Sequence, residues 1–410
     1  MQQNQTSALA GIKVLDLSRV LAGPWATQML ADFGAEVIKI EPPGKGDDTR
    51  GWGPPFIQGQ QGCDAAYFHT ANRNKHSVAI DFSKPEGQAL IHRLAAQSDV
   101  VVENFKVGGL AKYGLDYNSL KISNPGLIYC SITGFGQQGP MASQPGYDFM
   151  IQAMGGLMSV TGEPDGSPMK VGVALADILT GLYACNAIQA ALLYRHSTGL
   201  GQYIDLALLD VQIACLANQA MNYLTTGQSP NRFGNAHPNI VPYQSFATAD
   251  GHIILAVGND QQFARFCSLP GCEALLGQPQ YLTNAQRVQH RETLVPLVAD
   301  ILRQQSSQWW LTNLEALSIP CSPINNVGEA FANPQVQHRQ MQRQFSDKDG
   351  HTQPFVGNPI QFSQSPVQYH SPPPALGQHS EQILRQRLGL TGEELTHLVH
   401  LGVINAPVSD

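Results

Sequence analysis

Short apolar strands alternate with helices through the first third of the chain, and this alternation restricts the fold more than any other feature of the sequence. IKVLDL at residues 12–17 is typical of a strand, PWATQMLADF at 24–33 of a helix that begins at a proline, and AEVIKIE at 35–41 of a second strand. A strand, a helix and a strand in this order form a βαβ unit, from which parallel sheets are built. The same pattern predicts four further elements, namely strands at 76–81, 99–105 and 127–133 and a helix at 85–97. We therefore predict an α/β fold whose large domain holds a Rossmann-like, doubly wound parallel sheet.

The length of the chain and one change in composition predict two domains. A chain of 410 residues is longer than a single hydrophobic core usually supports. Residues 231–246 are rich in Asn, Gly and Pro, which is typical of a linker. We expect a large α/β domain at 1–225, a smaller α/β domain with its linkers at 226–325, and a C-terminal segment at 326–410 that returns to the large domain. Within that segment we expect one last helix near 379–389, followed by a polar tail.

Composition and motif searches exclude several classes of protein. Charged residues make up only 13% of the chain, against about 25% in typical soluble domains, which predicts that much of the surface is covered in an oligomer. The formal net charge is −7 and no basic run is present, so we expect no nucleic-acid partner. No apolar run reaches the roughly 18 residues that span a bilayer, and the N-terminus MQQNQTSALAG does not resemble a signal peptide. Seven scattered cysteines without a CxxC motif favour a reducing, cytoplasmic location. The HExxH, HxH and GxSxG motifs are absent, so we expect neither a catalytic metal nor a serine hydrolase.

One carboxylate, Asp177, stands alone in the apolar and small-residue run at 171–181, just where a long apolar helix is predicted. A buried carboxylate without a partner costs several kcal/mol, so Asp177 needs a reason to be there. It is either a helix N-cap, accepting hydrogen bonds from the N–H groups of Leu179 or Thr180, or a nucleophile that helix N–H groups keep ionised. The run by itself leaves both interpretations open.

Three loops combine small residues, amides and cations next to predicted strands. They are Ser18–Pro24, Asn72–Lys75 and Asn104–Lys106. Open α/β sheets bind ligands at the carboxyl ends of their strands, and these residue types suit a phosphorylated, adenine-bearing ligand. Ordinary turn chemistry with solvated charges explains each loop equally well when it is taken alone.

Residues 134–139, GFGQQG, match the GxGxxG pattern of dinucleotide-binding loops. The context disagrees, because Pro140 and the polar residues after it do not open a helix. We therefore do not expect a nicotinamide cofactor, although a glycine-rich loop close to a ligand or partner remains open.

Several motifs in order along nearly the whole chain resemble those of the class III CoA-transferases, the CaiB/BaiF family that includes formyl-CoA:oxalate and carnitine CoA-transferases. The matching segments are VLDLSRVLAGPWATQMLADFGAEVIKIE, NRNK, VVENF, SITGFGQQGP, PGYDF, ALADILTG, RHSTGLGQYIDLALLD, RFGNAHPNIVPY and PALGQHSEQIL. The resemblance implies an interlocked homodimer of two threaded rings. It also implies that CoA and acyl-CoA are substrates and that no cofactor is permanently bound.

The resemblance implies roles for individual residues, with Asp177 as the nucleophile that carries an aspartyl-CoA thioester. Residues expected to bind CoA are Val20, Ala22, Asn72, Arg73, Asn74, Lys75, Asn104, Phe105, Lys106 and Lys112. Residues expected to line the acyl pocket are Leu21, Gly146, Tyr147, Gly258 and Asn259.

The expected reaction moves CoA from an acyl-CoA donor to a free carboxylic acid. Leu21 stands where oxalate-using members of the family have Gln, so oxalate is a poor candidate for the acceptor. Arg50 and Arg73 are cations that could pair a second carboxylate, which gives a mild preference for a dicarboxylate such as succinate or glutarate.

Two other functions compete with CoA transfer. The α-methylacyl-CoA racemases share the fold, but they need a His before the Asp of a GxD motif, where this chain has Tyr147. A tyrosine, with a reference pKa of about 10, is a poor base at neutral pH. The third possibility is a CoA-binding protein without catalytic activity.

Overall fold

The computed structural model describes residues 7–59, 62–346 and 352–405, and the chain divides into two compact units. Unit 1 comprises Met1–Leu157, Val171–Ala220 and Gln337–Asp410, and unit 2 comprises Met158–Lys170 and Met221–Val336. The second unit thus includes the segment Met158–Lys170 as well as the region where the smaller domain is expected.

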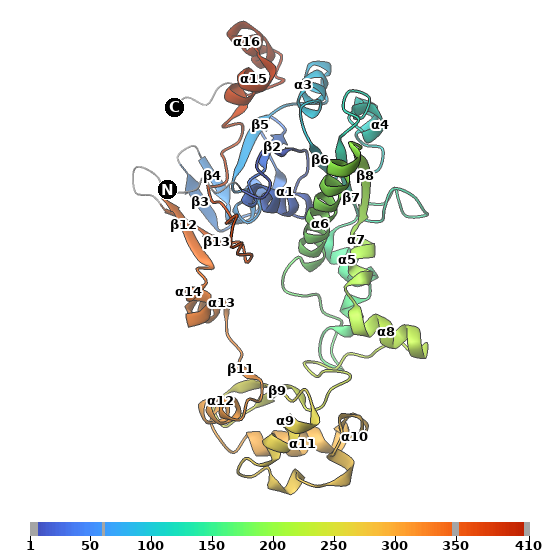
Figure 1. Ribbon diagram of the computed structural model, residues 1–410, viewed down its shortest axis with the longest axis vertical. Coiled ribbons are helices and arrows are strands. Elements are labelled where there is room, and N and C mark those ends of the chain that lie inside the picture. Colours follow the sequence, from blue (N-terminus) through green and yellow to red (C-terminus); the bar gives the residue numbers. More distant parts are fainter. Residues whose placement is uncertain (1–6, 60–61, 347–351, 406–410) are drawn as a thin grey trace. The chain divides into compact units, whose positions relative to one another are not determined.

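Unit 1 is built on a six-stranded parallel sheet with the strand order β5-β2-β1-β6-β7-β8 (Figure 1). The strands are β1 (Lys13–Asp16), β2 (Glu36–Glu41), β5 (Lys75–Ala79), β6 (Val100–Glu103), β7 (Ile128–Thr133) and β8 (Gln202–Ala207). The predicted α/β class and parallel sheet are confirmed, and the predicted strands lie within a few residues of the observed ones.

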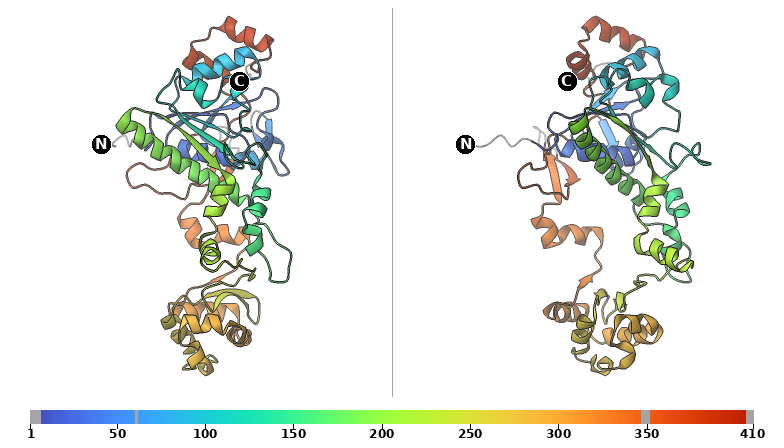
Figure 2. Two further views of the ribbon diagram at one scale, coloured as in Figure 1. Left: turned by 90° about the vertical axis from the view of Figure 1, so that its right-hand side faces the viewer. Right: turned by 45° about the vertical axis from the view of Figure 1, so that its right-hand side comes forward.

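Helices cover both faces of this sheet, so its strands are buried on each side and read as continuous apolar runs. Val14, Val37 and Val100 face α1 (Ala22–Asp32) and α6 (Leu175–Thr198). Their neighbours Leu15, Ile38 and Val101 face the opposite layer, which contains α3 (Pro85–Ala95), α15 (Ser380–Leu388) and α16 (Gly392–His400). Figure 2 shows α6, in green, beside α1, in blue.

The remaining elements of unit 1 are short. They are β3 (Phe56–Gly59) paired with β4 (Gly62–Ala65), β12 (Gln342–Ser346) paired with β13 (Thr352–Val356), α2 (Ala66–His69), α4 (Tyr117–Leu120), α5 (Asp148–Met154), α7 (Leu208–Ala214) and α14 (Pro334–His338), the last of which spans the boundary with unit 2.

Helix α6 is long and apolar enough to cross a membrane by length and composition alone. Its positions Ala184, Cys185 and Ile188 are buried and belong to the same core cluster as the strand residues beneath it. Its C-terminal Arg195 pairs with Asp99 at 2.8 Å. These contacts are those of a helix that packs on a sheet.

Unit 2 has an antiparallel sheet with the order β11-β10-β9, formed by β9 (Tyr243–Ala247), β10 (His252–Ala256) and β11 (Cys321–Pro323). The predicted linker therefore ends too late, because β9 begins at Tyr243, inside the range 231–246. The helices of this unit are α8 (Ala217–Thr226, which begins in unit 1), α9 (Asp260–Cys267), α10 (Asn284–Gln289), α11 (Arg291–Leu302), α12 (Ser307–Ala316) and α13 (Val327–Ala332).

The predicted polar tail after the last helix is also wrong, because α16 follows α15. Thr391 caps α16 and forms a capping box with Glu394. The sequence carries this signal as Thr-Gly-Glu-Glu, a polar pattern that begins a helix whose buried residues are only Leu395 and Leu398.

Candidate active site

An open cleft enclosing about 980 Å³ lies where three parallel strands end. Its walls come from the loops that follow β1, β6 and β7 and from the first turn of α6. This is the edge at which open α/β sheets bind ligands. Of the residues that we expected to bind CoA or the acyl group, nine line this cleft, namely Val20, Leu21, Ala22, Asn104, Phe105, Lys106, Gly146, Tyr147 and Asp177.

The loop between β1 and α1 is held in a strained conformation. Val20 has φ 70°, a left-handed conformation that β-branched residues rarely adopt. The N–H of Val20 donates to Asp47 Oδ2 at 3.2 Å. The Asn104 amide accepts from the Arg19 N–H at 2.8 Å and donates to the Arg19 carbonyl at 2.7 Å. Backbone strain that neighbouring groups enforce in this way is concentrated at functional sites, and no sequence motif indicated it here.

The N-terminus of α1 offers free backbone donors to the cleft. Within the described part of the chain, the N–H groups of Leu21, Ala22 and Gly23 have no hydrogen-bond acceptor. A helix N-terminus with unpaired N–H groups favours an anion or a developing negative charge. Gly23 is required here, because a Cβ at this position would lie 2.3 Å from Cβ of Ser18.

Two glycines, Gly134 and Gly146, meet in the wall of the cleft next to Tyr147. A Cβ on Gly146 would lie 2.4 Å from the Cα of Gly134, so neither position has room for a side chain. The GxGxxG pattern therefore brings two backbones together and, as expected, is not followed directly by a helix. Tyr147, next to this crossing, has a side chain that is 64% exposed.

Asp177 lies in the first turn of α6, but it is not the cap. The helix begins at Leu175 after Ala174, two residues before the predicted start, and Asp177 makes no capping bond. Asp148 takes that role, because its Oδ1 accepts from the N–H of Ala176 at 2.8 Å and from the N–H of Asp177 at 3.3 Å. The N-cap interpretation of Asp177 is therefore wrong.

The carboxylate of Asp177 has no ion pair or hydrogen bond among the residues that the structure describes. Burial, together with the negative charge of Asp148, raises the pKa of Asp177 to about 7. The expectation that helix N–H groups hold this carboxylate is therefore wrong, because those of Ala176 and Asp177 donate to Asp148 instead. Gly181, one turn later, places the helix against the start of α1, because a Cβ there would lie 2.8 Å from the Ala22 carbonyl oxygen. Asp177 lines the same cleft as Leu21 and Ala22 at the start of α1.

The loop Asn72–Lys75 does not line the cleft, because it precedes β5 and so lies at the amino end of that strand. Lys75 Nζ lies 3.1 Å from Asp16 Oδ2 and donates to Asn72 Oδ1 at 2.9 Å. The side chains of Lys75 and Asn72 are fully buried. Asn74 Nδ2 donates to the carbonyl of Gln368 at 2.9 Å. Placing this loop at the carboxyl edge of the sheet was therefore wrong.

The two arginines considered for a second substrate carboxylate are occupied within the protein. Arg73 Nε donates to Asp32 at 2.9 Å. Arg50 pairs with Glu41 and with Asp64, each at 2.7 Å, and is only 7% exposed. The prediction that Arg50 or Arg73 pairs a second substrate carboxylate is therefore wrong.

Three other predicted residues lie outside the lining of the cleft. Lys112 is exposed, and its ammonium lies 4.5 Å from the centroid of the Tyr113 ring. Gly258 and Asn259 belong to unit 2, where Gly258 N–H donates to Gln262 and Asn259 caps α9. Their expected role at the acyl group remains a prediction.

Sequence reasoning missed several residues of the cleft. Trp52 and Gln144 line it from loops that carry no motif, and Arg19 and Asp48 line it as an ion pair at 3.1 Å. Among the described residues, no three His, Cys, Asp or Glu side chains gather where they could hold a metal ion.

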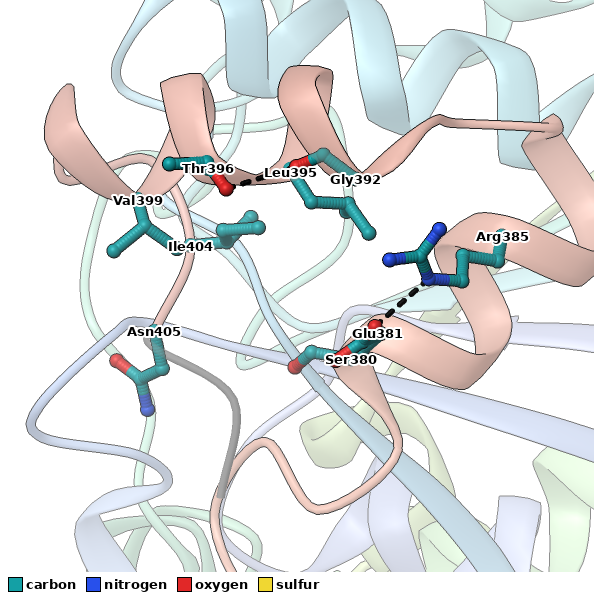
Figure 3. Close-up of a pocket in the computed structure, with 9 residues that line it drawn as sticks. All are labelled: Ser380, Glu381, Arg385, Gly392, Leu395, Thr396, Val399, Ile404 and Asn405. Carbon is teal, nitrogen blue, oxygen red and sulfur yellow. Dashed lines mark hydrogen bonds and ion pairs between the residues drawn. The ribbon is translucent and has the colours of Figure 1, made fainter. Parts of the chain in front are cut away.

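A second cavity lies between α15 and α16 (Figure 3). Aliphatic side chains of Leu395, Val399 and Ile404 line it, and its carboxylate, Glu381, is paired with Arg385 at 2.8 Å. It therefore lacks the unpaired acid that distinguishes the cleft at the strand ends.

Comparisons with known proteins agree along most of the chain. Residues 9–380 match the model of CoA-transferase family III. The chain is 54% identical to a succinate–glutarate CoA-transferase from Agrobacterium fabrum, over 93% of this chain and 96% of that protein. It is 42% identical to a human succinyl-CoA:glutarate CoA-transferase, over 98% of this chain and 91% of that one. A crystal structure of a CAIB/BAIF family protein from Brucella suis superposes with a TM-score of 0.83 at 51% identity, covering 93% of this chain and 100% of that chain.

Proposed function

We propose that Asp177 is the nucleophile of this chain, which belongs to CoA-transferase family III and moves CoA from an acyl-CoA to a free carboxylic acid. The observation that carries the proposal is the unpaired Asp177 carboxylate, which lies in the cleft at the carboxyl ends of β1, β6 and β7. A carboxylate suits this transfer, because its anhydride and thioester derivatives keep the acyl group activated.

The proposed reaction begins when an Asp177 carboxylate oxygen attacks the thioester carbonyl of the donor. The carbon–sulfur bond breaks and leaves a mixed anhydride and the CoA thiolate. The thiolate then attacks the aspartyl carbonyl, which releases the donor acid and forms an aspartyl-CoA thioester. The acceptor carboxylate attacks this thioester and expels CoA thiolate. Attack of that thiolate on the acceptor's acyl carbon completes the new acyl-CoA and frees Asp177.

The residues around Asp177 support these steps in distinct ways. We expect the free N–H groups of Leu21 and Ala22, which line the cleft, to stabilise the oxyanion of each tetrahedral intermediate. Arg19 and Lys106 are the cations among the lining residues of the cleft. Arg19 is paired with Asp48 at 3.1 Å, so Lys106 is the cation that we expect to bind the phosphate groups of CoA. Only the ionised carboxylate attacks, so the rate should rise with pH through the pKa of Asp177, which is about 7.

We infer that the acceptor or donor acid is a dicarboxylate of four or five carbons. Two curated relatives that align along nearly the whole chain are named for succinate or succinyl-CoA and glutarate, which supports this choice. Because Arg50 and Arg73 are already paired, a second carboxylate must be bound by other groups.

We also infer an interlocked homodimer and a cytoplasmic location. Large apolar side chains of α6, α7 and α8 are exposed in the single chain, among them Leu193, Ile213 and Leu224, which supports their burial by a second copy. All seven cysteines are free, which supports a reducing compartment. CoA and acyl-CoA enter as substrates, and the proposed steps need no resident cofactor.

A screen of acyl-CoA donors against free acids, read by chromatography of the CoA esters, tests the proposal. Transfer between succinyl-CoA and glutarate should be among the fastest reactions. The variant Asp177→Ala should bind CoA but lose transfer by several orders of magnitude, and retained turnover would refute the assignment. Deuterium exchange at the α-carbon of an acyl-CoA without an acceptor acid would instead support the racemase reaction.

A further inference from the structure

Asp148 and Gln152 form a clamp on the backbone that leads into α6. Asp148 Oδ1 accepts from the N–H groups of Ala176 and Asp177, at 2.8 and 3.3 Å. Its other oxygen accepts from Gln152 Nε2 at 2.8 Å. Gln152 is completely buried, and its Oε1 accepts from the N–H of Val171 at 2.9 Å. One carboxylate thus anchors both the approach to the helix and the residue that is proposed to attack the substrate.

The clamp also controls the electrostatics at Asp177. N–H groups at a helix start normally stabilise a nearby carboxylate. Here Asp148 takes those that flank Asp177, so the Asp177 oxygens are left without a donor among the described residues. Asp148 adds a second negative charge next to the nucleophile. Both effects make the Asp177 carboxylate a stronger base and therefore a better nucleophile.

We propose that Asp148 is a positioning residue for CoA transfer, which fixes the backbone of Asp177 and, by occupying the helix N–H groups, keeps the Asp177 carboxylate unpaired. The inference rests on the proposed role of Asp177 and deepens it. Asp148 touches no substrate in this account, because it acts through Asp177 alone.

The groups that face Asp177 from other elements are few. Asp148 comes from α5 and Tyr67 from α2. Burial, together with the charges of Asp177 and Asp148, raises the pKa of the Tyr67 phenol. Arg19, Asp48 and Lys106 line the same cleft. Of these, Asp148 is the carboxylate that contacts the α6 backbone, so it is the group to alter.

The first test uses the unaltered protein. Initial rates with limiting succinyl-CoA, measured across pH, should give a kcat/KM that falls on the acid side with a midpoint near the Asp177 pKa of about 7. A midpoint near the reference value of about 4 for aspartate would overturn the inference, whether or not any variant folds.

The second test removes the charge and keeps the cap. In Asp148→Asn, Oδ1 still accepts from the helix N–H groups, so the acid midpoint should move down by about one pH unit while the plateau of kcat falls several-fold. The variant Gln152→Leu leaves the charge of Asp148 in place, so its midpoint should stay while kcat falls. Glu86→Gln, on α3 across the sheet, removes one exposed charge and should leave the whole profile unchanged.

The two possible failures can be told apart. An unmoved midpoint in a folded Asp148→Asn protein sinks the inference but leaves the proposed function intact, provided that Asp177→Ala is inactive. Retained transfer in Asp177→Ala sinks the proposed function itself. A loss of thermal stability in Asp148→Asn without any kinetic change would show that the clamp is only structural.

Discussion

The loops Asn72–Lys75 and Asn104–Lys106 look alike in sequence, since each combines asparagine with a cation next to a strand of the same sheet. Asn104–Lys106 follows β6 and lines the cleft, whereas Asn72–Lys75 precedes and enters β5 at the strand's amino end. Lys106 is exposed, and Lys75 is fully buried against Asp16. The position of a loop before or after its strand, rather than its composition, therefore decides whether its side chains face a ligand or hold the fold together.

The buried loop joins parts of the chain that are distant in sequence. Lys75 reaches Asp16 of β1, Arg73 reaches Asp32 of α1, and Asn74 accepts from the N–H of His370 in the C-terminal segment at 2.7 Å. Burial lowers the pKa of Lys75 to about 8, so this lysine is still largely protonated at neutral pH. The two loops should therefore respond to substitution in opposite ways.

The largest effect on stability should come from Lys75→Met. It leaves Asp16 as an unpaired buried charge, so the free energy of unfolding should fall by about 3–5 kcal/mol in urea titrations. The double variant Asp16→Asn/Lys75→Met removes both charges and should recover part of the loss. A single variant as stable as the parent would show that the pair does not hold the loop.

A smaller effect, on binding alone, is expected for Lys106→Ala. The KM for acyl-CoA should rise about tenfold, equivalent to about 1.4 kcal/mol, with kcat and the unfolding free energy unchanged. The matched control is Lys121→Ala, which removes another exposed lysine that does not line the cleft. Equal KM values for the two variants would contradict the assignment of Lys106 to CoA.

The smallest effect should appear as a pH dependence of stability beside β5. His379 Nδ1 accepts from the Ser77 N–H at 3.2 Å, and burial together with the nearby His76 lowers the pKa of His379 from 6.5 to about 4. The unfolded chain therefore binds more protons between these values, so stability should fall as pH drops from 6.5 towards 4. His379→Asn keeps an acceptor but cannot titrate, so urea midpoints across this range should show a shallower slope. An unchanged slope would show that groups other than His379 cause the loss of stability at low pH.

The periodic features of the fold could be predicted from sequence. Strand and helix positions follow from local apolar patterns, which is why five of the six strands of the main sheet, all except β8, were expected close to their observed bounds. The hairpin β3–β4 and helix α16 were missed, because short or mostly polar elements leave weak patterns. For the cleft, the resemblance to a family supplied residues that the local patterns alone left open.

Pairing between charges could not be predicted, because it depends on tertiary contacts. Lys75 meets a carboxylate 59 positions earlier in the chain, and Arg73 meets one 41 positions earlier. The role of Asp177 depended on a shift of two residues in the start of α6, which gave the cap to Asp148. An error of this size is normal for helix boundaries, yet here it decides which of the two acids accepts the N–H groups at the start of the helix.

Chemical trapping of the acyl-enzyme shows which residue carries the thioester during CoA transfer. The protein is incubated with succinyl-CoA without an acceptor acid, treated with hydroxylamine, digested and analysed by mass spectrometry. We expect a hydroxamate on Asp177, because hydroxylamine attacks the aspartyl thioester carbonyl and releases CoA. A hydroxamate on a different acid, or none at Asp177 in a preparation that still transfers CoA, would contradict it.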